Sequence, residues 1–132
     1  MSKLTKLNIT VYYEDTDAAG VVYHANYLKF MERGRTEWLR KLGFEQRLLS
    51  IRTGVMFVIH KSTLKFVKPA RLDDQLTVNT EVEAVHGASI TFKQSVRSSA
   101  DDLLCEGANQ IACVDVESLA PCRIPQELRQ AL

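Results

Sequence analysis

Residues 26–42, with the sequence NYLKFMERGRTEWLRKL, decide the predicted fold. Apolar side chains recur there at helical spacing and most charged side chains fall elsewhere, which predicts a long amphipathic helix. Asn26 is a suitable N-cap and Gly43 a suitable C-terminal stop. Gly34 costs about 1 kcal/mol relative to Ala in a helix, so we expect another backbone to approach closely there. The apolar stripe comprises Tyr27, Met31, Trp38 and Leu42, with Leu28 and Leu39 beside it.

The segments around this helix show the two-residue periodicity of β-strands. A sheet that is apolar on one face must cover that face, and one long helix across it would do so. We therefore expect an α+β hotdog fold, an antiparallel β-sheet wrapped around a long central α-helix. Periodicity alone leaves an unrelated α+β sandwich open. The predicted strands are 9–13, 56–67, 76–85, 90–96 and 103–116, a polar connector follows the long helix, and Pro125 can open a short terminal helix.

Length, charge and composition narrow the function classes. The chain has 132 residues, of which 17 are basic and 16 acidic, so a single domain over 1–132 is expected with no broad attraction to nucleic acid or to an anionic membrane. The first residues lack the apolar segment of a secretory signal, and no stretch approaches about 18 apolar residues. We expect a cytoplasmic protein without membrane insertion. The three cysteines form no CxxC pair, which predicts free thiols and no zinc site.

Residues 12–27 have the sequence YYEDTDAAGVVYHANY. They place two aspartates, a histidine and an asparagine between a predicted strand and the long helix. Their middle part, 14–20, lacks periodicity and is predicted to be a loop. A helix start offers unpaired N–H groups and a partial positive charge, which stabilise carboxylates and developing oxyanions. A carboxylate in this loop is therefore well placed for acyl chemistry.

Simpler interpretations of the same loop exist. Asp15 and Asp17 do not fit a calcium loop, because Ala19 occupies the third ligand position and Asn26 occupies the position of the closing Glu. The two aspartates could serve only to cap turns, and His24 considered alone is more often a packing residue than a catalytic one. Motifs for other chemistries (GxSxG, the P-loop, GxGxxG and HExxH) do not occur in the sequence, so we expect no metal and no cofactor.

The run Tyr12–Asp17 followed by Gly20–Tyr27 resembles the signature of tol-pal-associated acyl-CoA thioesterases, which belong to the wider 4-hydroxybenzoyl-CoA thioesterase family. One departure is Gly34, where relatives are expected to have Ala. The resemblance spans nearly the whole chain. It continues through Glu32-Arg33, Arg35-Thr36-Glu37, Leu39-Arg40, Phe57-Val58, Pro69 to Asp74, and Cys113-Val114-Asp115.

The resemblance implies a hotdog fold and hydrolysis of acyl-CoA thioesters to free acid and CoA. Asp17 matches the catalytic aspartate, which would act as nucleophile or as general base. His24 matches a site residue that could hydrogen-bond Asp17, position water or supply only its backbone N–H to the thioester carbonyl. The family also places the site at a dimer interface. Because the edge strands of a hotdog sheet have unpaired backbone groups, we expect a homodimer that assembles into a homotetramer. The implied substrate-binding residues are Tyr13, Tyr23, Asn26 and, from the facing subunit, Met56, Phe57 and Val58.

Two other functions stay open at this level. One is a hotdog hydratase or dehydratase, which would pair a histidine with a carboxylate for proton transfer; the other is a non-catalytic partner of acyl carrier protein. The basic residues of the predicted strand 56–67 and the turn after it could meet CoA phosphates or protect a sheet edge. These residues are Lys61, Lys65, Lys68 and Arg71.

Overall fold

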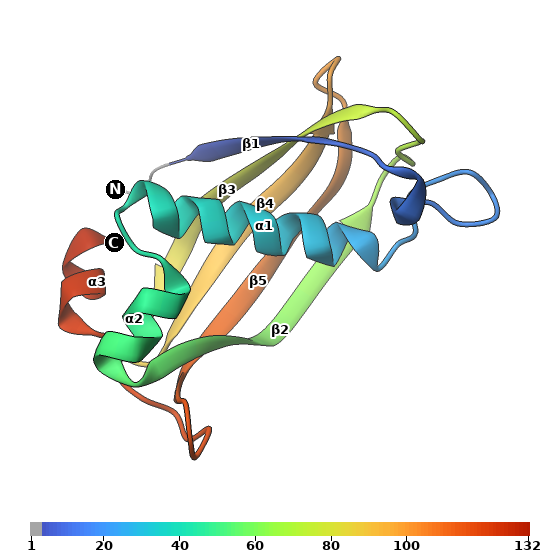
Figure 1. Ribbon diagram of the computed structural model, residues 1–132. Coiled ribbons are helices and arrows are strands. Elements are labelled where there is room, and N and C mark those ends of the chain that lie inside the picture. Colours follow the sequence, from blue (N-terminus) through green and yellow to red (C-terminus); the bar gives the residue numbers. More distant parts are fainter. Residues whose placement is uncertain (1–3) are drawn as a thin grey trace.

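The computed structural model describes residues 4–132. Five antiparallel strands form one sheet in the order β1-β3-β4-β5-β2, and the long helix α1 lies across one face of that sheet (Figure 1). This is the predicted antiparallel sheet wrapped around a central helix. The elements are β1 Thr5–Thr10, η1 Tyr13–Asp15, α1 Asn26–Lys41, α2 Gln46–Thr53, β2 Val55–Phe66, β3 Gln75–Val85, β4 Ser89–Ser98, β5 Leu103–Asp115 and α3 Gln126–Ala131.

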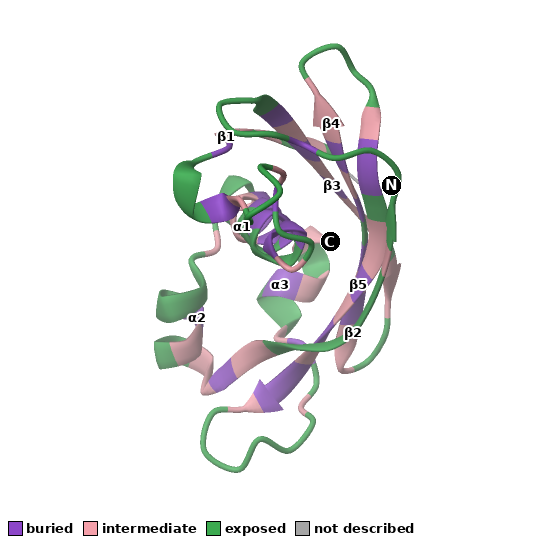
Figure 2. Ribbon diagram, turned by 90° about the vertical axis from the view of Figure 1, so that its right-hand side faces the viewer, coloured by how far each residue is buried: buried purple, intermediate pink, exposed green. Residues whose placement is uncertain are grey.

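The core lies between α1 and the sheet, where the buried residues gather (Figure 2). Phe30 and Met31 are fully buried under the first half of α1, and Trp38 packs under the second half, edge-to-face with Phe92 at 5.3 Å between ring centroids. Burying each such side chain contributes about 1.5–3 kcal/mol. These contacts hold α1 on β1, β3 and β4, the strands against which it packs.

Gly34 lies where α1 approaches the sheet most closely. A Cβ atom at this position would lie 2.6 Å from Thr80 Oγ1 and 2.9 Å from Val78 Cγ1. Both side chains are β-branched, fully buried and hard to move. The expected close approach is therefore present, but it is made by side chains of β3; the prediction of a neighbouring backbone was wrong.

The ends of α1 agree only in part with the prediction. Gly43 follows the helix with φ +93°, and its N–H donates to the Arg40 carbonyl at 2.9 Å, so the predicted stop is confirmed. The predicted N-cap was wrong. Ala25 occupies that position without a side-chain cap, and Asn26 is the first helical residue. The Asn26 amide instead binds the preceding loop.

Two further boundaries differ from the sequence prediction. The first strand was predicted over residues 9–13, whereas the observed strand β1 ends at Thr10. It ends there because the Asp15 carboxylate accepts the Tyr12 N–H at 2.8 Å and the chain turns into η1. The polar connector contains the helix α2, of which Leu49 is the one buried residue. Its other two large apolar residues, Leu48 and Ile51, are exposed, so this eight-residue helix has no clear apolar stripe and leaves almost no periodic signal.

The two edges of the sheet differ in length and exposure. β1 has 6 residues, whereas β2 has 12 and carries exposed apolar side chains such as Ile59 and Phe66. A bulge at His60 interrupts the pairing of β2 with β5. The backbone N–H and C=O groups on the outer side of β2 therefore form a long, unprotected sheet edge, which favours pairing with another strand.

Candidate active site

The loop before α1 is a tight hairpin held by its own backbone. Thr16 and Val22 form an isolated bridge, and the Asp17 N–H donates to the Val21 carbonyl at 2.9 Å. Gly20 has φ +80°, a conformation that glycine adopts without strain. The loop projects beyond the start of α1 (Figure 1), so the side chains at its tip face solvent.

Asp15 anchors this loop to the helix. It is 4% exposed, and its Oδ1 accepts the Asn26 Nδ2–H at 2.8 Å while its Oδ2 accepts the Tyr12 N–H. Its backbone carbonyl accepts the Tyr23 N–H at 2.9 Å. Asp15 and Asn26 thus fix the path of the chain on both sides of the loop tip. Asn26 was predicted to contact substrate, and in the structure its side-chain amide donates a hydrogen bond to Asp15.

Asp17 has the opposite environment. Its side chain is exposed, and Oδ1 accepts the Ala19 N–H at 2.9 Å in a local turn. No cation of residues 4–132 forms an ion pair with it. The carboxylate is therefore held in one place by the loop and still has an oxygen available for a reactant.

Two backbone donors stand at the start of α1. The N–H groups of Asn26, Tyr27 and Leu28 donate to carbonyls one turn earlier. Within residues 4–132 the N–H groups of His24 and Ala25 have no such partner. Unpaired amides at a helix N-terminus can stabilise the oxyanion of an acyl-transfer transition state.

The His24 ring makes aromatic contacts rather than hydrogen bonds within the part of the chain that the structure describes. Its centroid lies 4.4 Å from that of Tyr23 and 6.2 Å from that of Phe66. His24, Phe66 and Tyr27 line a shallow pocket of about 270 Å³ beside the helix start. Phe66, at the end of β2, was not predicted as a site residue, because only the fold brings it to His24.

The predicted site residues do not all meet in one chain. Tyr13 and Tyr23 are exposed near the loop, beside Asp17 and His24 in sequence. Met56, Phe57 and Val58 begin β2, whereas Phe66 ends it. Ten residues of strand span about 30 Å, so Met56–Val58 lie far from the helix start of their own chain.

A larger groove runs between α1 and β2, because α1 packs toward the opposite edge of the sheet. Its volume is about 560 Å³. Arg35 lines it, and Leu28, which the helical pattern placed beside the core stripe, is exposed to it. The apolar walls are Leu28, Leu39, Phe57, Ile59 and Ile111.

Other chemical groups give no second catalytic centre among residues 4–132. No cluster of three or more His, Cys, Asp or Glu side chains could hold a metal ion there. Cys105 and Cys113 are free and buried, and burial raises the pKa of each thiol to about 11, which disfavours the reactive thiolate. None of the helices between residues 4 and 132 has the length and apolar character needed to cross a membrane.

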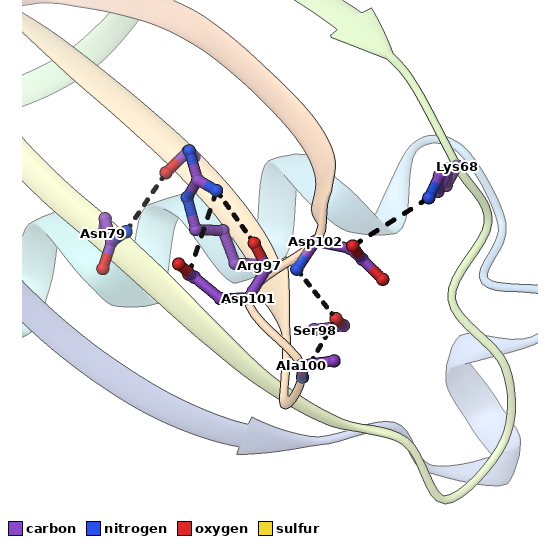
Figure 3. Close-up of polar contacts among 8 residues, drawn as sticks. Lys68, Asn79, Arg97, Ser98, Ala100, Asp101 and Asp102 are labelled. Atoms are coloured by element: carbon purple, nitrogen blue, oxygen red, sulfur yellow. Dashed lines mark hydrogen bonds and ion pairs between the residues drawn. The ribbon is translucent and has the colours of Figure 1, made fainter.

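One of the basic residues at the β2 end, Lys68, takes part in an exposed ion pair. Lys68 Nζ lies 4.0 Å from Asp102 Oδ1, at the turn between β4 and β5 (Figure 3). In the same turn the Ser98 hydroxyl accepts the N–H groups of Ala100 and Asp102. Both partners of the Lys68 ion pair are exposed, so the pair contributes little stability and leaves Lys68 able to exchange its carboxylate for a phosphate.

Comparison with known proteins agrees with this architecture. The family profile described as the thioesterase-like superfamily matches residues 11–132. Acyl-CoA thioester hydrolase YbgC of Escherichia coli O6:H1 is 43% identical over 120 residues, which cover 91% of this chain and 89% of that protein.

Solved structures show the same fold. A probable thioesterase from Bartonella henselae superposes with a TM-score of 0.87 at 35% identity, covering 93% of this chain and 100% of that one. A 4-hydroxybenzoyl-CoA thioesterase bound to 4-hydroxybenzoyl-CoA superposes with a TM-score of 0.89 at 20% identity, covering 97% of each chain, which supports the fold alone. The predicted hotdog fold and family are confirmed: this chain belongs to the thioesterase-like superfamily.

Proposed function

We propose that the protein hydrolyses acyl-CoA thioesters to a free acid and CoA, with Asp17 as the catalytic carboxylate. The observation that carries this assignment is that two suitable groups follow each other in one short segment of the chain. A carboxylate held in a rigid loop, Asp17, precedes a helix start with two unpaired backbone donors, at His24 and Ala25. Membership of the thioesterase-like superfamily and the relatives' acyl-CoA thioester hydrolase activity support the same reaction.

The chemistry requires little machinery. The thioester carbonyl oxygen would accept hydrogen bonds from the His24 and Ala25 amides, which stabilise the negative charge that develops on it. In one route an Asp17 oxygen attacks the carbonyl carbon, the CoA thiolate leaves, and water cleaves the resulting anhydride. In the other route Asp17 takes a proton from water as that water attacks. Either route ends with the same acid and thiol.

The proposed site is completed by a second copy of the chain. Antiparallel pairing of two β2 edges about a two-fold axis near Lys61 would set residue 56 of one chain opposite residue 66 of the other. Met56–Val58 of the partner would then lie beside Phe66 and hence beside His24, from which they are distant in their own chain. The exposed, 12-residue edge supports this arrangement. A tetramer of two such dimers is the assembly that we propose.

Release of free thiol distinguishes this function from the alternatives. We expect purified protein to release CoA from a series of acyl-CoA thioesters, measured with a thiol reagent, with equal amounts of free acid detected by mass spectrometry. A hydratase would alter the acyl chain and leave the thioester intact, and a non-catalytic partner of acyl carrier protein would bind without turnover. Acyl carrier protein thioesters tested in parallel would show which carrier is preferred. A product that retains its thioester would contradict the assignment.

His24→Ala should reduce kcat by no more than about tenfold. The ring donates or accepts no hydrogen bond within residues 4–132, so the backbone N–H at this position is the group that we assign to the reaction. Loss of the ring removes contacts with Tyr23 and Phe66 and should act mainly on KM. Steady-state kinetics separate these effects. A loss of kcat as large as that from removing Asp17 would instead assign the imidazole a direct role in proton transfer.

A further inference from the structure

Arg35 is a buried cation without a carboxylate partner. It is 9% exposed and lines the groove between α1 and β2. Its Nη1 donates to Gln94 Oε1 at 3.1 Å. A guanidinium has five N–H donors, yet within residues 4–132 it makes no other hydrogen bond and no ion pair. Several donors of a buried charge are therefore left for a group that is not part of the chain.

The surrounding residues leave part of this charge unpaired. Gln94 Oε1 also accepts the Asn109 Nδ2–H at 2.8 Å, so both of its lone pairs are used. Glu32 is exposed at the groove rim, where its Oε2 accepts the Thr36 hydroxyl at 2.5 Å, and within residues 4–132 it forms no ion pair with Arg35. Burial lowers the pKa of Arg35, an effect that the charge of Glu32 opposes. An unpaired buried charge is costly, so an anionic ligand would be stabilised here.

The groove that Arg35 lines begins three residues after Ala25, one of the two proposed oxyanion donors. It begins at Leu28 and Lys29, in the first turn of α1. Arg35 follows Ala25 by ten residues, or about 15 Å of helix, and its side chain leans back toward the helix start, leaving roughly 10 Å. Hydrogen bonds of about 3 Å at the two ends leave roughly 4 Å. An extended chain advances about 1.2 Å per bond, so about three to four carbon–carbon bonds fill this distance.

We propose that Arg35 determines acyl specificity by binding a terminal carboxylate, so that the preferred substrates are CoA half-thioesters of dicarboxylic acids about four to five carbons long. The methylene chain would lie against apolar walls such as Leu28 and Ile59, and the carboxylate would pair with the guanidinium. This inference rests on the proposed function, because it requires the reacting carbonyl to lie at the start of α1. A purely apolar acyl chain would fill the same walls but leave Arg35 unpaired.

The test compares glutaryl-CoA with pentanoyl-CoA, which have about five acyl carbons each by the length estimate above and differ in a terminal carboxylate against a methyl group. We expect the wild-type protein to have the higher kcat/KM for glutaryl-CoA. Arg35→Met should lower the ratio of the two kcat/KM values at least about tenfold, because Met replaces the apolar stem of Arg35 and removes the charge. No turnover of either thioester would refute the proposed function, whereas turnover of pentanoyl-CoA without preference for glutaryl-CoA would refute only the role of Arg35.

Two further variants test whether the effect on the ratio belongs to Arg35 and to its planar guanidinium. Lys29→Met removes an exposed cation from the rim of the same groove and should change the ratio less than about threefold, because solvent screens that charge. An effect as large as that of Arg35→Met would place the carboxylate at the rim and overturn the proposal. Arg35→Lys, checked for folding by thermal melting, keeps the charge without the planar fork. It should lower the ratio partially, and an unchanged ratio would also overturn the proposal.

Discussion

Asp17→Asn is expected to lower kcat by about a thousandfold, the range typical of losing a positioned base or nucleophile. The amide has nearly the same shape as the carboxylate, and its oxygen can still accept the Ala19 N–H. The loop should therefore keep its conformation, while the group can neither attack a carbonyl nor accept a proton from water. Thiol release and thermal melting, measured on the same preparation, check both parts of this expectation. Near-normal turnover by a folded variant would remove Asp17 from the mechanism.

Asp15→Asn is the matched control, since it makes the same change two residues away. Asp15 is buried and accepts two hydrogen bonds, from Tyr12 and Asn26. An amide can accept only one of them through oxygen, and the unsatisfied buried donor costs about 1–3 kcal/mol. We expect a lower Tm and a smaller loss of kcat than in Asp17→Asn. Equal losses of kcat in two equally stable variants would mean that the two aspartates have been ranked incorrectly.

Dilution is expected to abolish activity in step with dissociation of the dimer. In the proposed assembly Asp17 and the helix start come from one chain and Met56–Val58 from the other, so a monomer has no complete site. Specific activity should follow the dimer fraction, measured by light scattering over the same concentration series. Because folding does not require the partner in this scheme, circular dichroism should change little where activity is lost. A stable monomer with full specific activity would contradict the shared site even if hydrolysis itself were confirmed.

The sequence by itself predicted most of the elements and singled out the loop before α1. The periodicity of residues 26–42 and of four strand segments depends on neighbours within a few positions, so α1 and β2 to β5 were predicted nearly at their observed places, whereas the first strand was predicted at 9–13 and lies at Thr5–Thr10. The run from Tyr12 to Tyr27 pointed to the thioesterase fold and to Asp17, because its residue types and spacing occur together in one short segment. The short helix α2 was not predicted, because it buries only Leu49 and has no apolar stripe that would reveal a helical period.

Only the tertiary structure decided which distant segments meet. Strand order is set by pairing between residues far apart in sequence, and it makes β2 an edge next to β5, with Phe66 at His24 and Met56 at the other end. The environment of Arg35 has the same origin. In sequence it is one charged residue of an amphipathic helix, but α1 packs toward β1 and β3 and brings it against Gln94, 59 residues later. Its burial without a counterion results from packing between separate elements, for which local periodicity carries no information.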